Sequence, residues 1–103
     1  MNNELKSLLQ LAKKAGKLSY GYDAAERSCR NGDSALILMA KDLSARTQKG
    51  FSYNANAYNI NFKEVGTKKD FGIILNRKEV GIISINDKNF AEGILKSLIN
   101  SEE

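Results

Sequence analysis

The segment Ala35-Leu36-Ile37-Leu38-Met39-Ala40 is continuously apolar. A run of this length without a polar residue is typical of a strand that is covered on both faces of a sheet. A second run, Val80–Ile85, has the same length and is again strongly apolar. Together the two runs predict buried central strands with helices on both sides.

Helices and shorter strands are predicted around these two runs. The apolar residues recur at three- and four-residue spacing in five segments, which predicts helices there: Asn3–Ala15, Tyr22 or Asp23 to Asn31, Ala45–Tyr58, Thr67 to about Leu75, and Asp87 to Asn100. Two further strands are expected at Leu18–Tyr20 and Ile60–Val65, and the end of the chain, Ser101–Glu103, is expected to fray. Strands that alternate with helices indicate an α/β fold with a parallel or mixed sheet between helical layers. One domain is expected to fill residues 1–103.

Three helix starts can be predicted from their capping residues. Ser44 and Asp87 stand where a helix begins, and their side-chain oxygens can accept from the free amides of the first turn. Thr67 and Asp70 resemble a capping box with Asp in place of Glu.

The composition excludes several classes of protein. The 103 residues include no His and one Cys, so His-based catalysis, Cys-based metal clusters and an internal disulfide are ruled out. Cys29 is expected to face inward as a small core residue. No phosphate-binding glycine loop or metal-binding carboxylate cluster can be found, and we expect no catalytic activity, no metal and no cofactor. No apolar run approaches the ~18 residues of a membrane span, and no signal peptide is visible, so a soluble cytoplasmic protein is expected.

Positive charge is concentrated in the first half of the chain. The formal net charge is +4. Residues 1–50 hold nine basic and five acidic side chains, and residues 51–103 hold seven of each. Five of the basic residues lie between Lys13 and Arg30. This distribution suits a polyanionic partner, although the net charge of +4 taken alone favours a solvated surface with a small bias.

The turn Gly21-Tyr22-Asp23-Ala24 is the candidate binding site. A glycine turn that leads into a helix leaves amide groups free and directs a positive dipole end outward. Lys17 precedes the turn, and Arg27 and Arg30 follow it on the helix. Tyr20 and Tyr22 flank Gly21 and can stack on an unpaired base. The alternative, equally supported by these residues, is that Tyr22 packs in the core and Tyr20 is an ordinary strand residue.

Four stretches of the chain carry a family pattern. They are Gly16-Lys17-Leu18 with Gly21, Ala35–Asp42, Glu64–Lys68 with Phe71-Gly72, and Ile85–Ala91. In order and spacing these stretches resemble the kink-turn RNA-binding ribosomal proteins of the L7Ae superfamily, and most closely its small bacterial branch. The resemblance implies a three-layer α/β/α sandwich with a central four-stranded mixed sheet. It also implies RNA binding at the turn around Gly21.

The resemblance implies specific roles for the residues of this turn. In the family a Gly-Thr-Asn-Glu segment opens the second helix, its Asn and Glu read guanines of sheared G·A pairs, and a Lys three positions later contacts RNA. Gly21 and Arg27 match the Gly and the Lys, whereas Tyr22, Asp23 and Ala24 replace Thr, Asn and Glu. An ionised Asp accepts but cannot donate, and Ala can do neither. We therefore expect backbone contacts to be retained better than base reading.

The resulting hypothesis is a monomeric cytoplasmic protein that binds structured, kink-turn-like RNA, associated with translation or the ribosome. A protein–protein module on the same scaffold is the alternative, because Asp23 and Ala24 are what lost base reading would produce. The candidate RNA contacts are Lys14, Lys17, Tyr20, Gly21, Tyr22, Asp23, Ala24, Arg27, Arg30, Lys41, Arg77 and Lys78. Arg77 and Lys78 belong to the loop Asn76–Val80, which is apolar in the family and here offers phosphate contacts instead.

Overall fold

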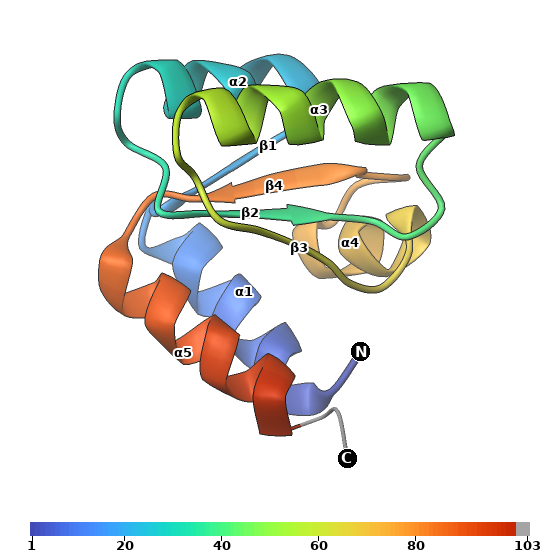
Figure 1. Ribbon diagram of the computed structural model, residues 1–103. Helices are drawn as coiled ribbons and strands as arrows, with labels where there is room; N and C mark the ends of the chain where they lie inside the picture. The colour runs from blue at the N-terminus through green and yellow to red at the C-terminus, as the bar shows by residue number, and fades with distance from the viewer. Residues whose placement is uncertain (101–103) are drawn as a thin grey trace.

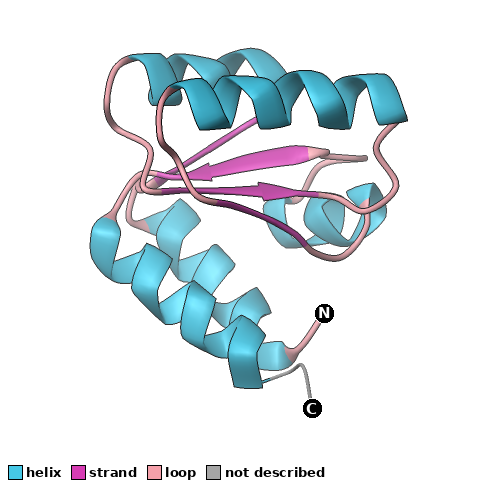
Figure 2. Cartoon of the chain, in the orientation of Figure 1, coloured by secondary structure: helices cyan, strands magenta, loops and turns pink. Residues whose placement is uncertain are grey.

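A mixed four-stranded sheet lies between two layers of helices (Figure 1). The computed structural model describes residues 1–100, so the fraying expected at Ser101–Glu103 lies outside the described residues. The elements are α1 (Asn3–Lys14), β1 (Leu18–Tyr20), α2 (Tyr22–Arg30), β2 (Leu36–Met39), α3 (Ala45–Ala57), β3 (Phe62–Glu64), α4 (Lys68–Leu75), β4 (Ile82–Ile85) and α5 (Lys88–Asn100). Figure 2 shows α2 and α3 on one face of the sheet and α1, α4 and α5 on the other. The predicted three-layer α/β/α sandwich is confirmed.

The sheet has the strand order β1-β4-β2-β3. β4 runs antiparallel to both β1 and β2, and β2 runs parallel to β3. The register pairs Tyr20 with Ile83 and Met39 with Ile82. Consequently β1, β2 and β3 all end, and β4 begins, at the same end of the sheet.

Alternate residues of the central strands face opposite helical layers. Leu36 and Leu38 belong to the core beneath α1, α4 and α5, whereas Ile37 and Met39 pack with residues of α2 and α3. All four side chains are fully buried. The continuously apolar sequence of β2 is thus explained by burial on both faces.

The predicted helix caps are present. The Ser44 hydroxyl accepts from the amide of Thr47 at 3.2 Å, and Asp87 Oδ1 accepts from the amide of Phe90 at 2.9 Å. Thr67 and Asp70 form the reciprocal capping box at the start of α4. In each case a side-chain oxygen accepts from an amide that has no partner within the helix.

β3 and β4 each begin two residues later than the sequence predicts, and in both cases a backbone amide is engaged elsewhere. The Ile60 amide donates to the Ala55 carbonyl at the end of α3, at 2.8 Å, so β3 begins only at Phe62. The Val80 amide donates to the Lys68 carbonyl of α4, at 3.0 Å, which leaves Val80 in the loop before β4. Apolar character alone does not distinguish a residue in a strand from one that follows a helix.

Cys29 lies in the core, as predicted. It is 2% exposed and packs beneath α2 with Ile37, Met39 and Phe51. Burial raises the pKa of the Cys29 thiol above its ordinary value; a hydrogen bond with Ser34 opposes this effect, and the charge of Glu26 adds to it.

We expect the thiol of Cys29 to be unreactive in the folded protein. The thiolate is the nucleophile, and a raised pKa together with burial reduces its population at pH 8. Alkylation by iodoacetamide at that pH should therefore be far slower in buffer than in denaturant. Equal rates in the two solutions would show that Cys29 is accessible and ionised.

Candidate functional site

The end of the sheet at which β1, β2 and β3 finish brings four connecting segments together, and we call it the loop edge. Its segments are the turn at Gly21, residues Ala40–Ser44, residues Val65–Thr67, and residues Asn76–Gly81. Backbone hydrogen bonds of 2.9 Å join Gly21 to Ile82, Ala40 to Gly81 and Lys41 to Gly66. These bonds hold segments that are distant in sequence at one end of the sheet.

Gly21 makes the turn from β1 directly into α2. Its φ of 92° and ψ of 156° lie in a region that is essentially restricted to glycine. A Cβ on Gly21 would meet no atom within 4 Å, so the requirement comes from the backbone rather than from crowding. Position 21 is therefore occupied by glycine because of its backbone conformation.

The first turn of α2 presents three amides without acceptors. Gly21 provides no side-chain cap, and within the part of the chain that the structure describes no oxygen accepts from the amides of Tyr22, Asp23 and Ala24. Tyr22 and Asp23 are exposed and Ala24 is half-buried. A helix N-terminus with free amides has the geometry that binds anionic oxygens.

Arg77 reaches this turn from the loop after α4. Its Nε donates to the Tyr20 hydroxyl at 2.7 Å, and its guanidinium carbon lies 5.6 Å from the centre of the Tyr20 ring. This cation–π geometry places a guanidinium beside the residue that precedes Gly21. The structure therefore brings together two predicted site residues that are 57 positions apart in sequence.

The loop that carries Arg77 is fixed by α4. Asn76 ends the helix in the left-handed conformation, with φ 57° and ψ 47°, and the Arg77 amide donates to the Gly72 carbonyl at 2.8 Å. A Cβ on Gly72 would lie 2.5 Å from the Lys78 carbonyl oxygen, so only glycine lets the loop fold back on the helix. This close approach of the loop to Gly72 was not predicted from the sequence, although a glycine within a short helix was the available signal.

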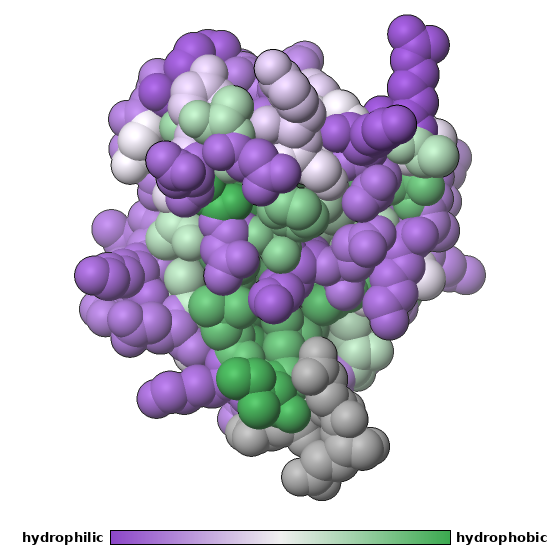
Figure 3. Space-filling view, viewed as in Figure 1, coloured by the Kyte–Doolittle hydropathy of each residue, from purple (hydrophilic) through white to green (hydrophobic). Residues whose placement is uncertain are grey.

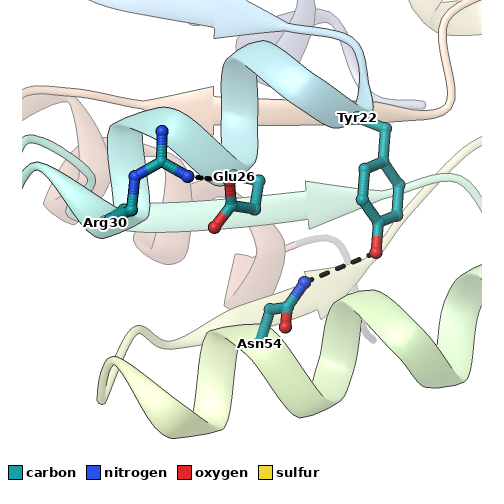
Figure 4. A network of polar contacts seen from close by, with 4 residues as sticks. All are labelled: Tyr22, Glu26, Arg30 and Asn54. Atoms are coloured by element: carbon teal, nitrogen blue, oxygen red, sulfur yellow. Dashed lines mark hydrogen bonds and ion pairs between the residues drawn. The ribbon is translucent and has the colours of Figure 1, made fainter.

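Tyr22 is neither buried nor free. It is 40% exposed, and its ring packs edge to face on Phe51 at a centroid distance of 5.1 Å. Figure 4 shows the ring reaching from α2 to α3, where the Asn54 side-chain amide donates to the Tyr22 hydroxyl at 3.4 Å. The alternative in which Tyr22 packs in the core is therefore not observed, although Ala25 and Cys29 of the same helix are buried. The Tyr22 ring extends sideways to α3 instead of down to the sheet.

The predicted basic residues are divided between the two ends of the sheet. Lys41, Arg77 and Lys78 lie on segments of the loop edge, and Arg27 is exposed on the second turn of α2. Lys17 precedes β1 and therefore lies at the opposite end, about 13 Å from Gly21 along an extended strand. Arg30 lies about 12 Å along α2 from Tyr22.

Two further predicted cations, Arg30 and Lys14, lie away from the loop edge. The Arg30 guanidinium pairs with Glu26 at 2.7 Å (Figure 4). Lys14 lines a hollow between α1 and α4 together with Leu11 and Ile74. The structure thus assembles a smaller basic set at the loop edge than the sequence alone suggests.

Arg46, Lys49 and Tyr53 on α3 are exposed and were not among the predicted site residues. α2 and α3 both start at the loop edge, and Tyr22 contacts Phe51 and Asn54 of α3, so these side chains project from the helix against which Tyr22 packs. Only this contact, which the sequence does not indicate, relates them to the turn at Gly21.

Residues 1–100 contain neither a metal-binding cluster of side chains nor a membrane-spanning helix. No group of three or more His, Cys, Asp or Glu residues is placed to hold a metal ion in that part of the chain. None of its helices combines the length and the apolar character needed to cross a membrane.

The layered fold and the converging loops define a small α/β/α domain of the ribosomal-protein type. Residues 3–94 match the model of the Ribosomal protein L7Ae/L30e/S12e/Gadd45 family, and the chain belongs to that family. The resemblance drawn from the sequence motifs is therefore confirmed.

Two relatives support the assignment to the small bacterial branch. The chain is 28% identical over 91 residues to "RNA-binding protein YlxQ" of Bacillus subtilis (strain 168), an alignment that covers 88% of this chain and 91% of that protein. Among solved structures it is similar to a protein of unknown function from Bacillus halodurans C, with a TM-score of 0.87 and 26% identity. That match covers 97% of this chain and 100% of the other. The resemblance to the small bacterial branch of the family is thus confirmed as well.

Proposed function

We propose that this protein binds structured RNA at the loop edge, with the N-terminus of α2 against the backbone of a kinked strand. The observation that carries the proposal is the conformation of Gly21, which leaves three free amides at the surface beside the Tyr20–Arg77 pair. Membership of a ribosomal protein family and the name of the YlxQ relative support RNA as the partner. The protein acts by binding, without catalysis, as a cytoplasmic monomer associated with translation or the ribosome.

Phosphate contacts dominate the proposed interaction. The amides of Tyr22, Asp23 and Ala24 donate to phosphate oxygens, and Arg27, Lys41, Arg77 and Lys78 neutralise neighbouring charges. Contacts of this kind position an RNA without reading its sequence. Asp23 and Ala24 lack the groups with which the family's Asn and Glu read guanine edges, so the protein selects the shape of the kink.

A comparison of two RNAs and two charge reversals tests the proposal. The affinity for a kink-turn hairpin and for a straight duplex is measured over a range of salt concentrations. Arg27→Glu should weaken hairpin binding about tenfold or more and reduce the salt slope by about one. Lys96→Glu, an equal charge change on an exposed residue of α5, should have little effect.

Two outcomes would contradict the proposal. Equal affinities for hairpin and duplex, with a steep salt slope, would leave only non-specific attraction to a polyanion. The absence of binding to either RNA at low salt would exclude an RNA-binding function at this edge.

A protein partner is the second candidate function, and one surface favours it. A hollow of about 270 Å³ lies between β3 and α5, lined by Asn61, Lys63, Glu64, Val65, Leu95, Leu98 and Ile99. Figure 3 shows apolar residues gathered on the lower part of the molecule, where Figure 1 places α5. β3 is also an edge strand, which a partner strand can extend. If the hollow between β3 and α5 carries the function, the variants Gly21→Glu and Arg27→Glu will co-purify with the same partner as the unmodified protein. Under the leading proposal, RNA will no longer co-purify with either variant.

A further inference from the structure

We infer that the surface where α2 meets α3 seats one unpaired nucleotide of the bound RNA, with Tyr22 and Tyr53 as stacking rings. We call this surface the α2–α3 seat; it consists of Tyr22 on α2 and of Arg46, Lys49, Gly50, Tyr53 and Asn54 on α3. The inference rests on the proposed function, since it adds a second contact for the same RNA.

Tyr22 is held in place by α3 while much of its surface stays accessible. Phe51, which is fully buried, contacts one side of the Tyr22 ring at an interplanar angle of 87°. Asn54 holds its hydroxyl at 3.4 Å, and two-fifths of the residue remain in solvent (Figure 4). A ring that is fixed before binding loses little further rotamer freedom when a base stacks on it.

Tyr20, the other candidate ring, is already occupied. The Arg77 guanidinium lies over the Tyr20 ring and also donates to its hydroxyl. Of the two tyrosines that flank Gly21, Tyr22 is therefore the one that offers an accessible surface to a base.

α3 supplies a second aromatic ring and an open surface next to Tyr22. Tyr53 is 75% exposed, and within residues 1–100 its side chain makes no hydrogen bond. It follows Gly50 by three residues, and helix geometry places it on the outer side of the same turn. Gly50 itself lies against the Tyr22 hydroxyl, since a Cβ there would be 3.6 Å from that oxygen. The absence of a side chain at Gly50 leaves the surface of α3 beside that hydroxyl uncovered.

The charges around the seat suit an RNA backbone. Arg46 and Lys49 are exposed, and neither forms an ion pair within the described part of the chain. α2 carries two carboxylates. That of Glu26 is paired with Arg30 at 2.7 Å, and that of Asp23, the residue after Tyr22, is exposed. Because Glu26 is paired, Arg46 and Lys49 supply two positive charges against the single negative charge of Asp23. Aromatic rings interleaved with cations are the usual platform for an unpaired strand, and they tolerate any base because every base has a stacking face.

The seat is continuous with the loop edge. α2 and α3 both begin at that edge and lie side by side on the same face of the sheet. The three free amides occupy the first turn of α2, and Tyr22 is the first residue of that turn. A strand whose phosphate meets these amides can place its next unpaired base on the seat without leaving the surface.

The inference is tested with one kink-turn hairpin in two forms. One form keeps the bases of its unpaired nucleotides, and the other carries abasic residues at those positions, which preserves the phosphates but removes stacking. Tyr53→Ala should weaken binding of the base-bearing hairpin about tenfold and leave the abasic hairpin unchanged. Tyr22→Leu, which keeps an apolar side chain against Phe51, should show the same selectivity. Tyr58→Ala is the matched control, because Tyr58 is a half-exposed tyrosine at the far end of α3.

Each result has a distinct meaning. If Tyr53→Ala and Tyr22→Leu bind both hairpins as tightly as the unmodified protein does, the seat is overturned while RNA binding at the loop edge stands. If both variants weaken both hairpins equally, the rings have no base contact and the seat is likewise overturned. If the unmodified protein binds neither hairpin at low salt, the proposed function itself is wrong and the seat falls with it.

Discussion

Replacing Asp23 with Asn and Ala24 with Glu should convert this protein into a reader of guanine edges. Asn can both donate and accept, and Glu can accept from a guanine, whereas Asp23 repels phosphate and Ala24 offers no polar group. Each restored base contact is worth ~1–3 kcal/mol. The double variant Asp23→Asn/Ala24→Glu should therefore bind a kink-turn with sheared G·A pairs at least about tenfold more tightly.

The gain should depend on the G·A pairs. The measurement compares a kink-turn hairpin with one in which the G·A pairs are replaced by Watson–Crick pairs, using both the double variant and Asp33→Asn. The double variant leaves the net charge unchanged, because Asp23→Asn removes one carboxylate and Ala24→Glu adds one. Asp33→Asn removes one exposed carboxylate outside the turn and shows the effect of losing a carboxylate alone. An equal gain on both RNAs would mean that the new side chains do not contact the G·A pairs. No gain on either would place the RNA elsewhere on the molecule.

Adding a single methyl group at Gly72 should destabilise the fold and disturb the loop edge. The Cβ of Gly72→Ala would approach the Lys78 carbonyl oxygen to 2.5 Å and that of Arg77 to 2.8 Å, and backbone atoms of a fixed loop cannot yield easily. Overpacking of this kind costs about 1–3 kcal/mol, and each kcal/mol lowers the Tm of a domain of this size by roughly 4–8 °C. Displacement of the loop should also separate Arg77 from Tyr20 and weaken RNA binding.

Gly93→Ala is the matched control for this prediction. Gly93 lies within α5, and a Cβ there would make an ordinary contact of 3.7 Å with Leu8. Alanine is favoured over glycine inside a helix by roughly 0.5–1 kcal/mol, so the Tm should stay constant or rise. Thermal unfolding followed by circular dichroism gives both values. If Gly72→Ala melts at the same temperature as Gly93→Ala, the close packing of the loop on α4 is not a constraint.

The fold was predictable wherever local pattern and tertiary packing agree. The apolar run at residues 35–40 gave β2 because both of its faces are buried, and the capping residues at Ser44, Thr67 and Asp87 located three helix starts. The starts of β3 and β4 were predicted two residues too early, because the amides of Ile60 and Val80 donate to helix carbonyls instead of to a neighbouring strand. Nothing in the identity of those two residues signals that choice.

The site was only partly predictable, because proximity in sequence is not proximity in space. Lys17 is four residues from Gly21, yet a strand separates them, while Arg77 reaches the turn from a distant loop. Tyr53 was not predicted as a site residue because the sequence does not indicate that Tyr22 packs against α3, the helix that carries Tyr53. Gly21 was the one local signal in the sequence for the turn that begins α2.

The location of the RNA on the protein is the central claim, and an amide-resolved NMR titration tests it most directly. Kink-turn hairpin is added to ¹⁵N-labelled protein, and the shift of every backbone amide is followed to saturation. The largest changes are predicted at Tyr22, Asp23 and Ala24, whose amides find no acceptor among residues 1–100. Saturable shifts confined to α5 and β3, with these three amides unchanged, would contradict the account.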